Sequence, residues 1–166
     1  GEGLGNQFLS HIRQCDALVE VVRCFENNDI IHVENTVDPI RDIEIINLEL
    51  CLADLDSVNK RLGKVESKAR IAKDKEAIYE NEILLRLKEV LEQGVAARRA
   101  NLNEEQKKFV NETYFLLTSK PILYVANVGE DDLIDLNQNP HFLAVKDYAS
   151  KEGSKVIPVS CQIESE

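Results

Sequence analysis

The chain has 166 residues, of which 43% are hydrophobic, and its formal net charge is −10. This length and this hydrophobic content suit one ordinary domain, or one domain with a long insertion, and they exclude wholesale disorder. The negative charge argues against a protein that coats nucleic acid nonspecifically.

Targeting and metal-binding patterns are not found in the sequence. No apolar run approaches the length of a membrane span and no signal-peptide pattern is present, so we expect a cytoplasmic protein. The cysteines and histidines are isolated, without a CxxC pair or another ligand spacing, so we predict no metal site and buried, reduced cysteines. These residues are Cys15, Cys24, Cys51, Cys161, His11, His32 and His141.

The chain opens with GEGLGN and contains no methionine. We interpret this start as that of a fragment from a larger protein. The first predicted element is a strand over residues 17–24 (ALVEVVRC), which is followed by Phe25.

A helical insertion is predicted over residues 38–103. Asp38 and Pro39 give an N-cap with proline at the first helical position. Apolar residues then recur at three- and four-residue steps in two runs, which the polar stretch Lys68–Glu76 separates. They are Ile43, Ile46, Leu48, Leu50, Leu52, Leu55, Val58, Leu62 and Val65, then Ile78, Leu84, Leu87, Leu91 and Val95. The pattern predicts an antiparallel coiled-coil hairpin, followed by a third helix over 104–117 with Asn103 and Gln106 as a capping box.

Positive charge is concentrated in residues 60–75. The basic residues there are Lys60, Arg61, Lys64, Lys68, Arg70, Lys73 and Lys75, against Glu66 and Asp74, so this segment carries +5 and the rest of the chain −15. The segment falls where the hairpin should turn. We predict that it binds phosphate backbones, as in ribosomal or other structured RNA. The alternative is a solvated helix end with no partner.

A β-α-β unit is predicted after the insertion. The apolar run Ile122–Ala126 is typical of a buried parallel strand, a helix follows over 140–151 with Asn139 as N-cap and Gly153 as its stop, and a last strand covers 156–159. About 95 residues separate the first two strands, whereas a parallel crossover needs roughly a dozen. The fold class is therefore α/β, with a helical insertion in a parallel sheet.

Polar and aromatic residues follow each predicted strand. Phe25 follows the first strand, Asn127, Val128 and Glu130 follow the second, and Ser160 and Cys161 follow the third. Ligands of open parallel sheets bind at this carboxyl edge, and an amide with a carboxylate can read the edge of a nucleotide base. We therefore predict a base pocket from these residues. The alternatives are a plain turn at Asn127 and a core position for Phe25.

Four blocks of the sequence resemble the Obg-like (YchF-type) ATPases of the P-loop GTPase class. They are GEGLGNQFLSHIRQCDALVEVVRCFE, DPIRDIEIINLEL, TSKPILYVANVGEDD and VIPVSCQIE, which together run over essentially the whole chain in order. The resemblance implies that residues 1–37 and 104–166 belong to a nucleotide-binding domain, that 38–103 form the family's coiled-coil arm, and that a TGS-type domain follows. It makes Gly1, Gly3 and Gly5 a remnant of switch II, although they also suit a frayed terminus.

The resemblance also implies a change of base preference. Asn127 and Glu130 stand where the guanine motif has Asn-Lys-x-Asp, so Val128 replaces the lysine stem that packs over the nucleotide. Glu130 is one methylene longer than aspartate, which misplaces its carboxylate for the paired donors of guanine. The resemblance therefore implies that ATP is preferred to GTP, with Mg²⁺ as cofactor.

The chain contains no GxxxxGK[ST] motif to hold the β- and γ-phosphates. We therefore expect this chain alone to be inactive, with no catalytic residue of its own and no tight nucleotide binding, and the intact protein to hydrolyse ATP or GTP. The alternative is a non-catalytic interaction module in which the helical hairpin is the functional part and the nucleotide site is vestigial.

Overall fold

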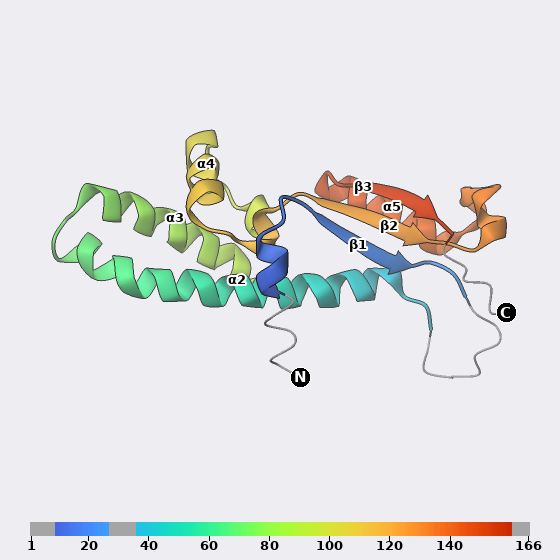
Figure 1. Ribbon diagram of the computed structural model, residues 1–166, viewed down its shortest axis with the longest axis horizontal. Helices are drawn as coiled ribbons and strands as arrows, with labels where there is room; N and C mark the ends of the chain where they lie inside the picture. Colours follow the sequence, from blue (N-terminus) through green and yellow to red (C-terminus); the bar gives the residue numbers. More distant parts are fainter. Residues whose placement is uncertain (1–8, 27–35, 161–166) are drawn as a thin grey trace. The chain divides into compact units, whose positions relative to one another are not determined.

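The computed structural model describes residues 9–26 and 36–160, and these fall into two compact units. One unit contains a parallel sheet and is formed by the described residues of 17–45 and 121–160. The other is helical and is formed by residues 9–16 and 46–120. Figure 1 shows the elements of both units in sequence colours.

The sheet has three parallel strands, as expected from the sequence, and the structure gives their order as β1-β2-β3. Their bounds are Leu18–Arg23 for β1, Ile122–Asn127 for β2 and Lys155–Val159 for β3. Arg23 is in register with Asn127, and Asn127 with Val159, so the three strands end side by side. The central strand thus extends one residue further than predicted and includes Asn127.

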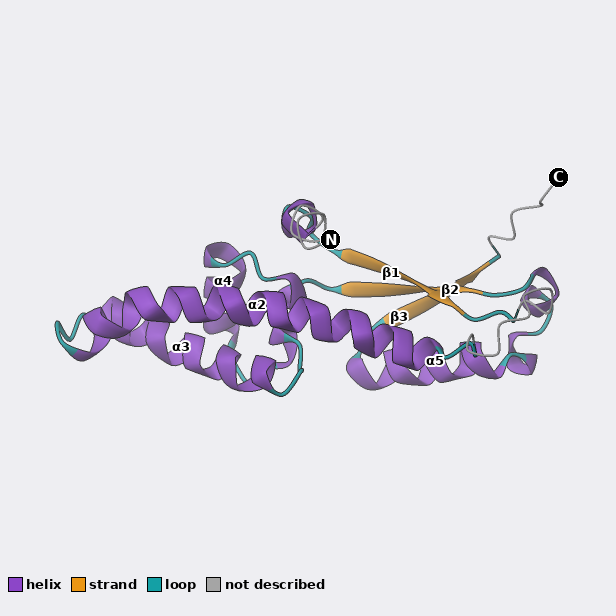
Figure 2. Ribbon diagram, turned by 90° about the horizontal axis from the view of Figure 1, so that it is seen from below, coloured by secondary structure: helices purple, strands orange, loops and turns teal. Residues whose placement is uncertain are grey.

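Helix α5 (Pro140–Glu152) packs on one face of this sheet, as Figure 2 shows. Its boundaries follow from local chemistry, because the Asn139 side chain caps the first turn and Gly153, with φ of 78°, ends the helix in a left-handed conformation. Tyr124 is fully buried between sheet and helix, and its hydroxyl donates to Glu152 Oε1 at 2.6 Å. The opposite face of the sheet leaves Val19 and Val21 exposed.

The insertion forms a helical hairpin of α2 (Pro39–Arg70) and α3 (Lys75–Glu92), coloured cyan to green in Figure 1. Asp38 Oδ1 accepts from Arg41 N at the start of α2, which confirms that cap. We call residues 68–76 the hairpin tip. Within it, Lys73 has φ of 50° and Asp74 caps α3 by accepting from two backbone N–H groups.

Apolar residues of α2 and α3 form a core of their own, with α4 (Glu104–Thr113) packed against it. The predicted Asn103–Gln106 capping box is present at the start of α4. This helix ends earlier than expected, at Thr113, and residues 117–119 form a short 3₁₀ segment. The compact helical unit extends to Lys120, and Phe109 and Val110 of α4 pack in its core. The boundary between insertion and nucleotide-binding domain at residues 103/104 stays a prediction.

Not every apolar residue of the predicted runs is buried. Ile46, Leu48, Leu52 and Ile78 are 40–54% exposed, since a helix buries only part of its circumference. The expected burial is confirmed for Cys24 and Cys51 but is wrong for Cys15, which is exposed, and Cys161 lies outside the described residues. Within residues 9–26 and 36–160, no helix combines the length and the apolar character that a membrane span requires.

Candidate functional site

The end of β2 carries the central residues of the predicted pocket. Asn127 is the last residue of this strand, and Glu130 is exposed at the start of a 3₁₀ segment, Glu130–Leu133. Val128 between them is 1% exposed, its side chain packs in the core, and its N–H donates to Val159 O at 2.8 Å. Val128 therefore offers neither its side chain nor its N–H to a ligand.

The residues after β1 lie beside the end of β2. Cys24 N donates to Asn127 O at 2.7 Å, which continues the pairing of the two strands by one residue. Burial, with the nearby Asp42 carboxylate, raises the pKa of the Cys24 thiol to about 12, so this thiol stays protonated. Phe25 is half-buried, and the Arg23 guanidinium stacks over its ring at 4.7 Å from the centroid. Phe25 is therefore fixed at this edge of the sheet rather than in the core.

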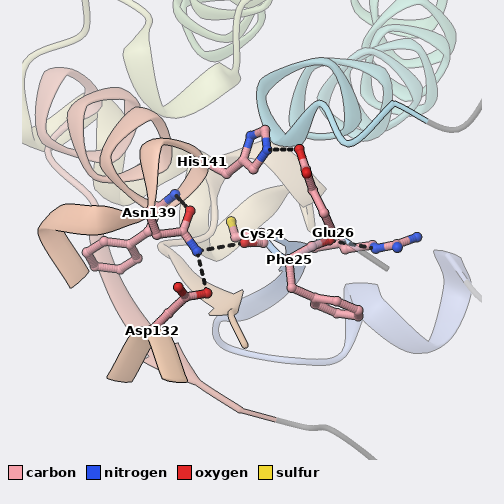
Figure 3. Close-up of polar contacts among 8 residues, drawn as sticks. Cys24, Phe25, Glu26, Asp132, Asn139 and His141 are labelled. Carbon is pink, nitrogen blue, oxygen red and sulfur yellow. Dashed lines mark hydrogen bonds and ion pairs between the residues drawn. The ribbon is translucent and has the colours of Figure 1, made fainter. Parts of the chain in front are cut away.

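Asn139 joins the segments around this edge (Figure 3). Its Nδ2 donates to Cys24 O at 2.8 Å and to Asp132 Oδ2 at 3.0 Å, while its Oδ1 accepts from Phe142 N at 3.0 Å. Asp132 Oδ2 also accepts from Gly129 N at 3.0 Å. A single amide therefore connects the end of β1, the loop after β2 and the first turn of α5.

A second contact links α5 to the residues after β1. His141 Nε2 lies 3.3 Å from Glu26 Oε1, and both residues are labelled in Figure 3. The Glu26 side chain is 69% exposed, so this pair contributes little to stability.

The structure brings together part of the predicted pocket. Phe25, Asn127 and Glu130 come from adjacent strand ends, and Ser160, which is half-buried, follows β3 on the other side of Asn127. Cys161 and the predicted switch remnant, Gly1, Gly3 and Gly5, lie outside the described residues.

Two residues that organise this edge were not predicted to do so. The sequence indicates Asn139 as a helix cap, but its bond to Cys24 spans 115 positions and has no local signal. Asp132 stands three residues after Gly129, a spacing that suits a side-chain-to-backbone turn and could have indicated its bond to Gly129 N.

The predicted basic segment lies at the hairpin tip and on the last turns of α2. Lys64, Lys68, Lys73 and Lys75 are exposed there. Two other members already have acidic partners: Lys60 Nζ lies 2.9 Å from Asp56 Oδ2, and Arg61 binds Glu80 with two nitrogens, at 2.5 and 3.1 Å. Arg70 makes a longer pair with Glu66, at 3.9 Å. The exposed lysines are thus the better candidates for an external anion.

The described residues contain no group of three or more His, Cys, Asp or Glu that could hold a metal ion. No chemical step is therefore assigned through a metal in this part of the chain.

Known proteins match this chain over nearly all of its own length. No protein-family model matches it. The "Ribosome-binding ATPase YchF" of Bacillus subtilis is 53% identical over 166 residues, which cover 100% of this chain and 45% of that protein. "Obg-like ATPase 1" of Saccharomyces cerevisiae is 39% identical over 170 residues, covering 99% and 43%. The solved "Schizosaccharomyces pombe YchF GTPase" is similar with a TM-score of 0.79 at 36% identity, covering 96% of this chain and 44% of that one.

The curated relatives are all longer than this chain, which spans about half their length. Both the sequence matches and the structural match run over nearly all of the 166 residues, and the parallel sheet with its helices is the fold that they share. Over the segment that it spans, the chain is therefore homologous to the YchF-type and Obg-like ATPases.

Proposed function

We propose that this chain forms the base-recognition edge and the helical arm of a ribosome-associated protein whose intact form hydrolyses ATP. The observation that supports this proposal best is the position of Asn127 and Glu130 at the carboxyl end of the central parallel strand, beside Phe25. This is the edge at which open parallel sheets bind their ligands. The curated relatives are named as ribosome-binding or Obg-like ATPases.

A preference for adenine follows from the side chains at this edge. The buried Val128 cannot pack over a nucleotide, and the exposed Glu130 carboxylate has one more methylene than the aspartate that reads guanine. A site built for paired donors loses much of its selectivity when its acceptors are misplaced. The relatives are named ATPases and the solved structure a GTPase, so ATP against GTP is the first comparison to make.

Hydrolysis is assigned to the intact protein. Because the chain has no GxxxxGK[ST] motif, we assign the binding of the phosphates, and of the Mg²⁺ that accompanies them, to residues outside this segment. The part played by this segment is to bind and orient the base.

The helical arm is proposed as the ribosome contact. Exposed lysines gather at the hairpin tip in a chain that is otherwise strongly acidic. A local positive charge of this kind binds phosphate backbones, while the acidic remainder disfavours nonspecific contact. A ribosome partner also places the protein in the cytoplasm.

Calorimetry with ATP and with GTP, each with Mg²⁺, tests the nucleotide part of this proposal. The full-length gene product is titrated, and the 166-residue chain is the control. We expect the full-length protein to bind ATP at least tenfold more tightly than GTP, and the chain alone to bind neither appreciably. Preference for GTP would contradict the role given to Glu130. If the full-length protein binds neither nucleotide, the enzyme assignment fails and the alternative of an interaction module with a vestigial site is supported.

A further inference from the structure

The Asn139 amide makes more hydrogen bonds than a helix cap needs. The residue is 4% exposed, and one bond, from Phe142 N to its Oδ1, is enough to cap α5. The other two bonds run from its Nδ2 to Cys24 O and to Asp132 Oδ2. These two bonds connect the start of α5 to the segment after β1 and to the loop after β2, which both lie at the candidate base site (Figure 3).

Each of these two segments carries a residue of the proposed pocket. Cys24 precedes Phe25, and its own N–H is bonded to Asn127 O, so Cys24 is held by both Asn127 and Asn139. Asp132 Oδ2 receives Gly129 N as well as the Asn139 amide, and Gly129 and Asp132 stand on either side of Glu130. The exposed Glu130 side chain therefore projects from a backbone that is fixed on both flanks.

We infer that Asn139 and Asp132 are positioning residues that set the discrimination between adenine and guanine, by fixing the Glu130 loop relative to Phe25. This inference rests on the proposed function of the same edge. Base discrimination depends on hydrogen bonds whose strength falls steeply with misalignment, so a loop that shifts by a fraction of an ångström weakens the selective contact more than the nonselective ones. The two residues act through Glu130 and touch no reacting atom.

The substitution Asn139→Ser separates this role from capping. Serine is as good an N-cap as asparagine, but its hydroxyl is too short to reach both Cys24 O and Asp132. In the full-length protein we expect Asn139→Ser to change the ratio of ATP to GTP affinity by about three- to tenfold, the effect of one or two lost hydrogen bonds. Asn103→Ser is the matched control, because Asn103 caps α4 in the helical unit, and it should leave the ratio unchanged.

A second variant tests whether the two residues act together. Asp132→Ala removes the acceptor shared by Gly129 N and the Asn139 amide, and it should shift the ratio in the same direction. If both residues act through one network, the double variant shows no larger shift than the stronger single variant. Asp132→Ala also keeps the inference testable if Asn139→Ser fails to fold.

Calorimetry and hydrogen exchange on the same proteins give distinguishable outcomes. The inference is supported if Asn139→Ser shifts the ratio and also loses exchange protection at the Gly129 amide. It is overturned, with the proposed function intact, if Asn139→Ser weakens both nucleotides equally or leaves both unchanged while the wild type still discriminates. If the wild type binds neither nucleotide, both the inference and the proposed function are overturned. The wild type is therefore measured before the variants.

Discussion

Asp54 is the centre of a buried hydrogen-bond network in the helical unit. Its fully buried carboxylate accepts from Leu117 N at 2.8 Å, from Thr118 N at 2.7 Å and from Thr118 Oγ1 at 2.5 Å. Thr118 Oγ1 in turn accepts from Ala97 N at 2.8 Å. These bonds tie α2 to the chain that leads into β2, and each donor among them is buried and needs an acceptor.

Thr118→Val is the smallest change that tests this network. It keeps the shape of the side chain but leaves Ala97 N without its acceptor and removes one donor to Asp54, so we expect a loss of about 2–3 kcal/mol of unfolding free energy. Urea unfolding of the 166-residue chain measures it. Thr113→Val, at the exposed end of α4, is the control and should change stability by less than about 0.5 kcal/mol. Equal effects from the two variants would show that the network does not matter for stability.

Side chains that act within a few positions were predictable from the sequence, and those that act across the fold were not. The caps at Asp38, Asn103 and Asn139 are local patterns, and all three are present. The bond from Asn139 to Cys24 and the bonds from Asp54 to the segment around Thr118 join positions 115 and 64 apart, and only the folded chain brings them together. The shared edge of the strand ends was predictable because the carboxyl ends of parallel strands meet at one edge, and the spacing of Gly129 and Asp132 indicates their local bond, whereas the bond from Asn139 to Cys24 was not predictable.

At the scale of elements, a partly buried ion pair ties α2 to α3. Arg61 bonds Glu80 with two nitrogens, and the Tyr114 hydroxyl donates to Glu80 Oε1 at 2.7 Å. The hydrogen bond from Arg61, followed by that from Tyr114, holds the pKa of Glu80 below its usual value despite the burial that raises it. The apolar pattern alone predicted the hairpin but gave no sign of this pair, because its members are 19 residues apart.

Glu80→Gln should therefore destabilise the hairpin in a pH-dependent way. The pKa of Glu80 is lower in the folded protein than in the unfolded chain. The ionised carboxylate therefore adds to the free energy of unfolding in full above the unfolded pKa of about 4.3, and this stabilisation is lost as pH falls through the folded pKa. Arg61 is 45% exposed, so solvent screens the pair, and we expect a loss of about 1–2 kcal/mol at pH 7 that shrinks by pH 3.

Chemical unfolding at both pH values measures the effect of Glu80→Gln. Asp56→Asn, which breaks the exposed pair with Lys60 on the same helix, is the control and should cost less than about 0.5 kcal/mol at either pH. A Glu80→Gln penalty that is the same at pH 7 and pH 3 would show that packing, and not charge, holds the two helices at this point.

At the scale of the whole molecule, the distribution of charge matters more than its sum. Residues 60–75 carry +5 in a chain of −10, and besides Lys60, which pairs with Asp56, the structure leaves four lysines exposed on this segment, Lys64, Lys68, Lys73 and Lys75. A basic segment in an otherwise acidic chain attracts a phosphate backbone locally, whereas the acidic remainder of the chain repels it. The sequence predicted the place of this charge, while the structure shows that Arg61 is engaged with Glu80.

Replacing these four lysines by glutamine should weaken ribosome binding and flatten its salt dependence. Each phosphate contact that is lost removes about 0.7–0.9 from the slope of log affinity against log salt concentration, so four contacts remove about 3. Co-sedimentation with ribosomes between about 50 and 200 mM salt measures the slope. The matched control replaces four lysines elsewhere, Lys88, Lys107, Lys108 and Lys151, each of which has an acidic partner on its own helix. Because both variants lower the net charge equally, an equal loss of binding would assign the effect to the overall field. Only a loss confined to the variant at Lys64, Lys68, Lys73 and Lys75 identifies the hairpin tip and the last turns of α2 as the contact.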